Sequence, residues 1–276
     1  MIFLGSIKNL KSFPKHKGFT LFELIIVIVL IGILAISLGK ISSVSVYSYI
    51  DAKDRNRMSH EARWIIERIA REARNAMAQS IRTGNNLGVD CVEFMPISNA
   101  SISTNLPASG SISDFNAVAY NLSFQANTYV AIMPLTASSV YAINGVLAPI
   151  ASVATTGNES TITLSSPSNF THRSPENRFL IVSRPVSFCL DTSSGQLSRY
   201  EGYNINQVQQ IPPSISGELI ADNLSSGTGM FSYQPGVLSR SGILQINFRL
   251  QNSTRNLSGN SEAFEYFHEV HIRNVP

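Results

Sequence analysis

The sequence predicts an α+β protein in which one long amino-terminal helix precedes a β-rich domain. Three observations predict this fold class: an apolar run over residues 19–38, a helical spacing of apolar residues that continues beyond it, and short strand-like segments separated by Ser, Asn and Gly after residue 87. The outer half of the helix has an apolar stripe that an antiparallel sheet can cover, so helix and strands are expected to share a core.

The apolar run has the length and composition of a membrane-spanning helix. Residues 19–38 hold a single charged residue, Glu23. Twenty helical residues span about 30 Å, the thickness of the hydrocarbon core, and a helix satisfies its own backbone hydrogen bonds there. Residues 1–18 contain four lysines and no acidic residue, which predicts a cytoplasmic amino terminus and places the rest of the chain across the membrane.

Two general interpretations of the apolar run remain open. The first is a secretory signal cut after the run, near the small residues Ala35 and Ser37, although such apolar regions are typically about 7–15 residues long and lack a carboxylate. The second is an uncut signal anchor that holds a periplasmic hydrolase or receptor. An uncut amino terminus and a pocket of converging titratable groups would favour the second reading.

A third reading comes from the residues at the start of the run. The segment Lys15-His16-Lys17-Gly18-Phe19-Thr20-Leu21-Phe22-Glu23 resembles the processing motif of type IV prepilins and type II secretion pseudopilins. The resemblance implies a leader over residues 1–18, cleavage by prepilin peptidase between Gly18 and Phe19, and N-methylation of Phe19. It also implies a type IV pilin-like fold, with a transmembrane helix half over residues 19–40.

Thr20 and Glu23 match the second and fifth positions of the mature chain in that motif. A carboxylate within a membrane is costly and usually has a partner. The resemblance implies an assembly role, in which Glu23 pairs with the terminal amine of a neighbouring subunit. The alternative is a local role, because Glu23 lies one turn into the helix and can interact with the exposed N–H groups of that turn.

The helix is expected to continue as an amphipathic half over residues 41–84. Apolar residues recur at intervals of three and four: Met58, Ala62, Ile65, Ile69, Ala73 and Ala76. The helix is predicted to end after Arg82, because Thr83–Asn86 contains a glycine that can stop it. We expect curvature or a break at Gly39–Ser45, where Ser and Val are weaker helix formers.

Residues 85–276 are predicted to form a β-rich head. The expected strands are Val89–Pro96, Ala117–Phe124, Tyr129–Met133, Ser160–Leu164, Phe179–Val182, Val186–Leu190, Gln196–Tyr200, Gly229–Tyr233, Leu244–Leu250 and Phe264–Arg273. The last two alternate between apolar and polar residues, and Thr192–Gly195 is predicted to turn a hairpin. Residues 98–115 are low in hydrophobicity and are predicted to be a loop.

Cys91 and Cys189 are the two cysteines of the chain. Outside the cytoplasm, such a pair predicts a disulfide. It would close a loop of nearly 100 residues, for which the chain-entropy model allows about 4–5 kcal/mol. The alternative is two buried free thiols, and neither cysteine has a CxxC partner or metal-ligand spacing.

Charge and motif content argue against several other functions. The formal charge is +3, but without the leader the chain has 17 Lys and Arg against 18 Asp and Glu, so its basicity does not indicate nucleic-acid binding. The sequence His268-Glu269-Val270-His271 is one residue short of the HExxH zinc motif and lies in a predicted strand, where its histidines point to opposite faces. We therefore expect no catalysis, cofactor, metal or small-molecule substrate.

Stretches farther along the chain narrow the resemblance. Residues 174–179, 184–189, 197–200 and 268–276 are similar to minor prepilins related to the J-type pseudopilins of type II secretion. This implies a subunit that assembles with other minor and major pilins to initiate or cap a filament, after insertion in the inner membrane with its head in the periplasm. A type II secretion pseudopilin remains the alternative within the family.

Overall fold

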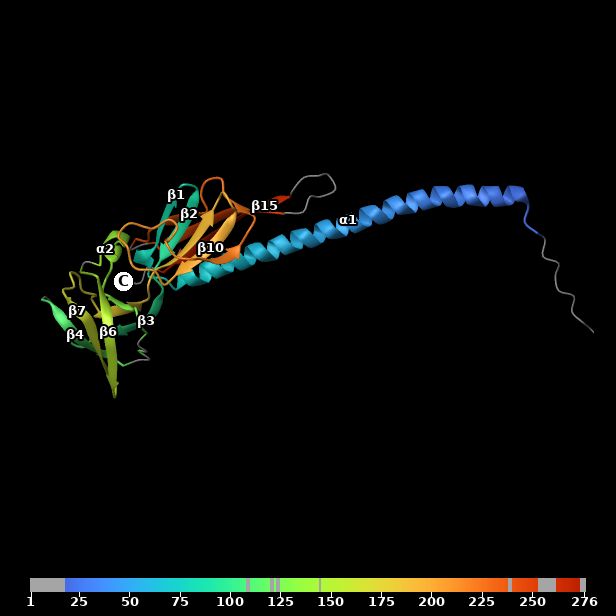
Figure 1. Ribbon diagram of the computed structural model, residues 1–276. Helices are drawn as coiled ribbons and strands as arrows, with labels where there is room; N and C mark the ends of the chain where they lie inside the picture. Colours follow the sequence, from blue (N-terminus) through green and yellow to red (C-terminus); the bar gives the residue numbers. More distant parts are fainter. Residues whose placement is uncertain are drawn as a thin grey trace, which may run out of the picture. The chain divides into compact units, whose positions relative to one another are not determined.

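The computed structural model describes residues 18–107, 110–119, 122, 125–143, 145–237, 240–252 and 262–273. The chain divides into two units, Met1–Lys53 and Asp54–Pro276. The α+β class is confirmed, because a long apolar helix is followed by antiparallel sheets (Figure 1). Except for Gly18, the predicted leader lies outside the described residues.

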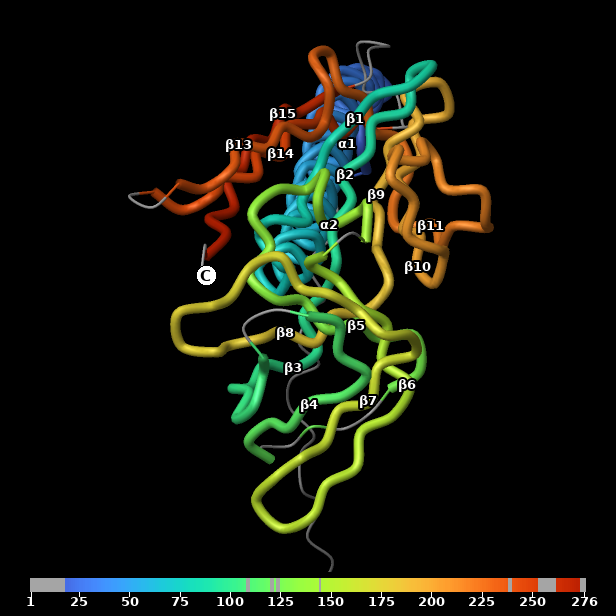
Figure 2. Tube along the Cα trace, turned by 90° about the vertical axis from the view of Figure 1, so that its left-hand side faces the viewer, coloured from blue at the N-terminus to red at the C-terminus, as the bar shows by residue number. Residues whose placement is uncertain are grey.

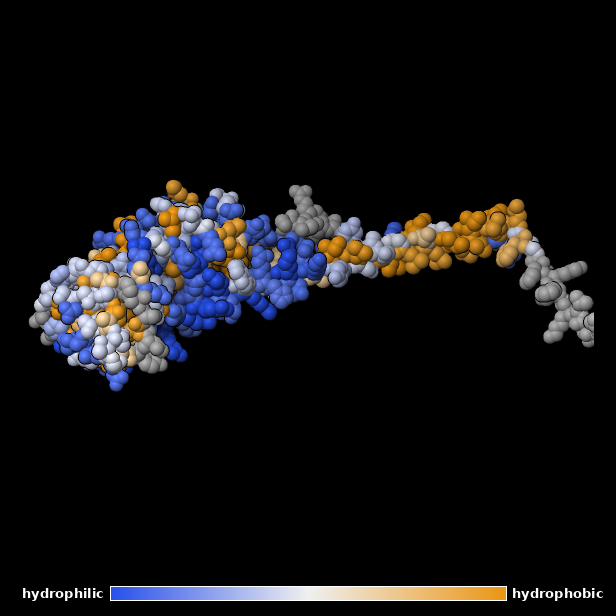
Figure 3. All heavy atoms as spheres, turned by 60° about the horizontal axis from the view of Figure 1, so that its bottom comes forward, coloured by the Kyte–Doolittle hydropathy of each residue, from blue (hydrophilic) through white to orange (hydrophobic). Residues whose placement is uncertain are grey.

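The first unit holds the apolar part of helix α1 (Leu21–Arg74). In the part of the chain that the structure describes, α1 is the one helix long and apolar enough to cross a membrane. Its apolar surface is displayed in Figure 3. The helix is unbroken through Gly39–Ser45, where Ser43 and Ser45 donate hydrogen bonds to carbonyls of the preceding turn at 2.8 and 2.9 Å.

The second unit contains the amphipathic end of α1, whose predicted stripe is confirmed from Met58 to Ala73, whereas Ala76 lies beyond the helix. The buried helix residues are Met58, Ala62, Ile65, Ile69, Ala70 and Ala73. The predicted end at Arg82 is wrong, because the helix ends at Arg74. Beyond it the Met77 N–H donates to the Met95 carbonyl at 2.9 Å, and the Asn75 amide donates to the Ile97 carbonyl at 2.9 Å. Pairing with a distant segment therefore replaces further helical turns.

Gly84, the glycine that was predicted to end the helix, lies within a strand instead. After the short 3-10 helix η1 (Ala78–Ser80), β1 (Arg82–Asn86) and β2 (Val89–Phe94) form an antiparallel hairpin. Its two turn residues, Leu87 and Gly88, have φ values of 48° and 83°. Positive φ at both central residues is the requirement of a tight hairpin turn that follows the strand twist.

Two sheets enclose the amphipathic helix. The first has the order β1-β2-β9-β10-β11, with β9 (Val186–Asp191), β10 (Gln196–Glu201) and β11 (Glu218–Ala221). In the second, β14 (Gly242–Gln251) pairs with β12 (Leu224–Ser225), β13 (Phe231–Gln234) and β15 (Ala263–Ile272). The predicted β9–β10 hairpin and the alternation of β14 and β15 are confirmed.

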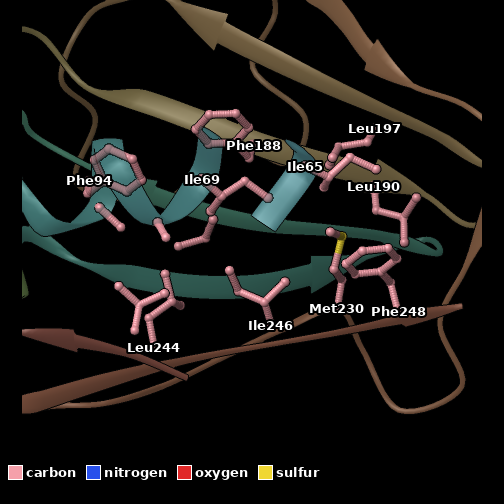
Figure 4. Close-up of a cluster of buried hydrophobic side chains, with 14 of the residues drawn as sticks. Ile65, Ile69, Phe94, Phe188, Leu190, Leu197, Met230, Leu244, Ile246 and Phe248 are labelled. Atoms are coloured by element: carbon pink, nitrogen blue, oxygen red, sulfur yellow. The ribbon is translucent and has the colours of Figure 1, made fainter. Parts of the chain in front are cut away.

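The main core lies between these sheets and the helix. Figure 4 shows Ile65 and Ile69 of α1 between Phe94 and Phe188 of the first sheet and Leu244 and Ile246 of the second. All of these side chains are buried. The helix thus supplies a full layer of the core, which fixes its amphipathic end within the second unit.

The remaining strands form a six-stranded barrel. They are β3 (Ile97–Ile102), β4 (Ile112–Val118), β5 (Tyr129–Ala131), β6 (Leu147–Thr156), β7 (Glu159–Ser168) and β8 (Arg178–Val182), in the order β3-β8-β5-β6-β7-β4, with helix α2 (Ala137–Tyr141) following β5. A bridge between Ser103 and Ala117 joins the edge strands and closes the barrel. Figure 2 shows these strands grouped apart from β13–β15.

The loop prediction for residues 98–115 is wrong, because β3 and most of β4 lie there. Its interior is apolar, and the rings of Phe115 and Phe179 meet edge to face at 5.2 Å. The barrel is inserted between β2 and β9. Pro96 and Pro185 mark the junction, because proline lacks the N–H that would continue a strand ladder across it.

Candidate functional site: the start of the amino-terminal helix

The segment Gly18–Glu23 marks where regular structure begins. Helix α1 starts at Leu21, and the Leu24 N–H donates to the Thr20 carbonyl at 3.2 Å. The Glu23 N–H donates to the Thr20 hydroxyl oxygen at 3.3 Å. The Thr20 side chain therefore satisfies one of the free N–H groups of the first turn, which makes it the N-cap of the helix.

This capping arrangement is a feature that our sequence reasoning missed. The spacing Thr-x-x-Glu is a known signal for a helix start, and it could have been found at Thr20 and Glu23. It places the Glu23 carboxylate in the first turn, at the positive end of the helix dipole, where a negative charge is stabilised. The local role considered for Glu23 is thus compatible with the geometry.

Gly18 and Phe19 precede the helix and are exposed. Phe19 has 78% of its surface accessible, and a side chain added at Gly18 would meet no atom of the described residues within 4 Å. The chain's own packing therefore does not require glycine at position 18.

The apolar surface that follows is fully exposed in the isolated chain. Phe22 is 71% exposed and Leu24 is 55% exposed, and every large apolar residue from Phe19 to Leu38 belongs to the exposed class. A continuous apolar helix surface of this kind is stable only when lipid or other helices cover it. The segment therefore has the physical properties of a membrane anchor.

Cys91 and Cys189 are joined by a disulfide, as predicted. They face each other in paired strands β2 and β9 and are 0% and 2% exposed. The bond connects the strands that lead into and out of the barrel, so it acts as a structural staple for the head.

A buried ionic cluster beside this sheet has no counterpart in our sequence predictions. The Arg82 Nε atom donates to the Glu93 carboxylate at 2.8 Å, and its guanidinium lies 3.5 Å from the ring centroid of Tyr141. Burial raises the pKa of Glu93 above its usual value, and the Arg82 cation opposes that rise. Arg82 also donates to the carbonyls of Asn206 and Gln207, so the cluster fixes the 203–209 segment to β1.

Among the described residues, the geometry does not support a catalytic or metal-binding role for the histidines discussed above. His268 and His271 lie in β15 opposite Ile246 and Ile243, in the strand arrangement that we predicted. No group of three His, Cys, Asp or Glu side chains in the described part of the chain is placed to hold a metal ion.

Comparison with known proteins gives one family match. Residues 13–39 match the prokaryotic N-terminal methylation motif. No curated protein and no solved structure matches the chain. The match spans Gly18, Phe19, Thr20 and Glu23 together with the apolar run, and it supports the type IV prepilin and pseudopilin class. Together with α1, it indicates a single-pass protein anchored in a membrane.

Proposed function

We propose that this chain is a minor pilin of an MSHA-type IV pilus, a structural subunit with no catalysis of its own. The observation that carries the proposal is the register of Gly18, Phe19 and Glu23 within the matched methylation motif, at the start of an exposed apolar helix. In this register, prepilin peptidase hydrolyses the Gly18–Phe19 bond and methylates the Phe19 amine. The helix then remains in the inner membrane, with the head in the periplasm, until the subunit joins the filament at the cell surface.

Glu23 has a defined part in that assembly. Cleavage creates a positively charged amine at Phe19, and the carboxylate of Glu23 on a neighbouring subunit is a suitable partner for it. In lipid, an unpaired charge costs several kcal/mol, so formation of the pair favours docking of one subunit on the next. Thr20 supports this arrangement by capping the helix next to the amine.

The assignment to the MSHA pilus rests on the resemblance of residues 174–179, 184–189 and 197–200 to the minor prepilin MshO. The first of these segments leads into β8, the second leads into β9, and the third lies within β10. By analogy with J-type pseudopilins, the subunit would initiate the filament or cap its tip together with other minor pilins.

A J-type minor pseudopilin of type II secretion is the second candidate, and the methylation motif favours it equally. Deletion of the gene distinguishes the two functions. Loss of surface pili with normal protein secretion supports the pilus assignment, whereas loss of secretion with normal pili supports the pseudopilin.

Replacement of Glu23 by Val tests the assembly role. The Glu23→Val chain should still be cut after Gly18, because the peptidase site precedes it, but its amount in sheared filaments should fall about tenfold or more for loss of a charge pair in lipid. Leu24→Val is the matched control, since it changes one apolar side chain and should leave incorporation unchanged. Wild-type incorporation of Glu23→Val would contradict the role.

A further inference from the structure

A groove of about 580 Å³ runs between the amphipathic end of α1 and strand β15. Arg63, Trp64 and Arg71 line it from the helix, and His268 lines it from the strand. All of these residues belong to the second unit. The groove is distinct from the processing segment and from the apolar core, and nothing in the proposed function accounts for it.

On its strand side the groove is lined by His268 of β15, and among the described strands β15 is an edge of its sheet. Strand β15 pairs with β14 along all ten of its residues, and no other described strand pairs with it. An open edge presents a row of backbone N–H and C=O groups that can accept another strand. Natural edges are often protected by proline, by short length or by charged residues. Strand β15 is ten residues long and contains no proline, its Glu265 and Glu269 contact Arg249 and Gln245 of β14, and its Phe267 is 60% exposed.

The other wall is basic and aromatic. Arg63 forms no ion pair with a described residue, and Arg71 contacts Glu67 at 3.5 Å in a pair whose side chains are 76% and 71% exposed. Such exposed pairs are weak, so Glu67 offsets little of the positive charge. Trp64 is 51% exposed and offers a flat ring beside these cations. The positive charge of Arg63 and Arg71 favours an anionic ligand, and the Trp64 ring favours a ligand that also has apolar groups.

An extended acidic peptide can pair with the edge strand β15 and interact with the basic helix side at the same time. A strand added to β15 would complete the backbone hydrogen bonds of the edge and direct every second side chain toward the helix flank, where acidic groups would meet Arg63 and Arg71. A phospholipid headgroup would neutralise the arginines but would leave the ten-residue edge unpaired. We propose that this groove binds an extended acidic segment of a neighbouring filament subunit as an added strand, a proposal that rests on the pilin function above.

Site-specific photo-crosslinking of the full-length protein in cells that assemble the filament tests the proposal. A benzophenone amino acid at Phe267 or Trp64 should form adducts with another subunit, and peptide mapping should place them in an extended acidic segment. The same group at Leu219, which is 54% exposed on β11, is the matched control and should form far fewer adducts. Adducts with lipid alone, or protein adducts no more abundant than at Leu219, would overturn the proposal.

Charge reversal tests the basic wall separately. The Arg63→Glu and Arg71→Glu double variant should lower the adduct yield at Phe267 about tenfold, the scale of a lost charge contact at an interface. Arg178→Glu, in a comparable exposed ion pair with Glu176, should leave the yield unchanged. An unchanged yield in the double variant counts against the proposal. If reversal lowers the unfolding temperature, the Arg63→Gln and Arg71→Gln pair must still reduce the yield.

The failure of this inference can be told apart from failure of the proposed function. An amino terminus at N-methyl-Phe19 and normal incorporation into filaments, without adducts at Phe267 or Trp64, would refute the groove proposal alone. A chain that is not cut at Gly18 would refute the pilin function on which the groove proposal rests.

Discussion

Thr20 caps helix α1, and Glu23 stands in the first turn that it caps. The same two residues lie within the matched N-terminal methylation motif. The local role and the proposed assembly role are physically compatible, because the cap engages the backbone N–H of Glu23 and not its carboxylate. The exposed position of that turn leaves the carboxylate open to a neighbouring amine.

Arg82 gives a residue-scale prediction for the stability of the head. Its partner Glu93 is 1% exposed, so Arg82→Met would leave a buried carboxylate without its cation. Removal of one partner of a buried pair costs about 3–5 kcal/mol. The unfolding free energy of full-length protein in detergent should fall by that amount at about pH 8, whereas Arg178→Met, in an exposed pair, should cost less than about 1 kcal/mol.

The same variant should show a defined pH dependence. Burial raises the pKa of Glu93 above its unfolded value near 4.5, so the folded state binds this proton more tightly. The resulting stability is present below the unfolded pKa and is lost as pH rises through the folded pKa. Arg82→Met removes the cation that opposes the rise, so its deficit relative to wild type should be smaller at about pH 5 than at about pH 8. An equal deficit at both would contradict the cluster's role.

At the scale of elements, regular local patterns were predictable and long-range pairing was not. The alternation over Leu244–Leu250 predicted β14, because a sheet with one buried face imposes a period of two. Strand β3 escaped prediction, and the strand predicted at Ala117–Phe124 overlaps β4 only at Ala117 and Val118. Strands of small and polar residues form through partners distant in sequence, as in the pairing of Ala100 with Leu180. The end of α1 at Arg74 also depends on a distant contact, between Met77 and Met95.

The disulfide gives a prediction at the scale of paired strands. Cys91 and Cys189 are 98 residues apart in sequence, so their bond removes much of the freedom of the unfolded chain. Replacement of both by Ala should lower the unfolding free energy of the full-length protein in detergent by about 2–5 kcal/mol. Wild-type protein under a strong reductant should show a similar loss, and equal stability of the oxidised and reduced forms would contradict the role of the bond as a staple.

At the scale of the whole molecule, one helix performs two physical tasks in succession. Its apolar part in the first unit requires lipid or other helices around it, and its amphipathic part completes the core of the second unit. The sequence predicted both halves, because each has its own hydrophobic pattern. It did not reveal the barrel inserted between β2 and β9, whose closure depends on the contact of Ser103 with Ala117.

The methylation motif could be recognised in the sequence for a different reason. Gly18, Phe19 and Glu23 lie in one short contiguous stretch that matches it, so no tertiary contact is needed to find it. The groove beside β15 could not be predicted in this way. It combines Arg63 and Trp64 with an open edge about 200 residues away, and only the fold brings them together.

The mass of the mature chain, measured on intact protein extracted from membranes, is the most direct test of the central claim. The account predicts a chain that begins at Phe19 and carries one methyl group on its terminal amine, because the proposed function assigns both reactions to that residue within the matched motif. A chain that retains Met1, or one that begins after Ser37, would contradict it.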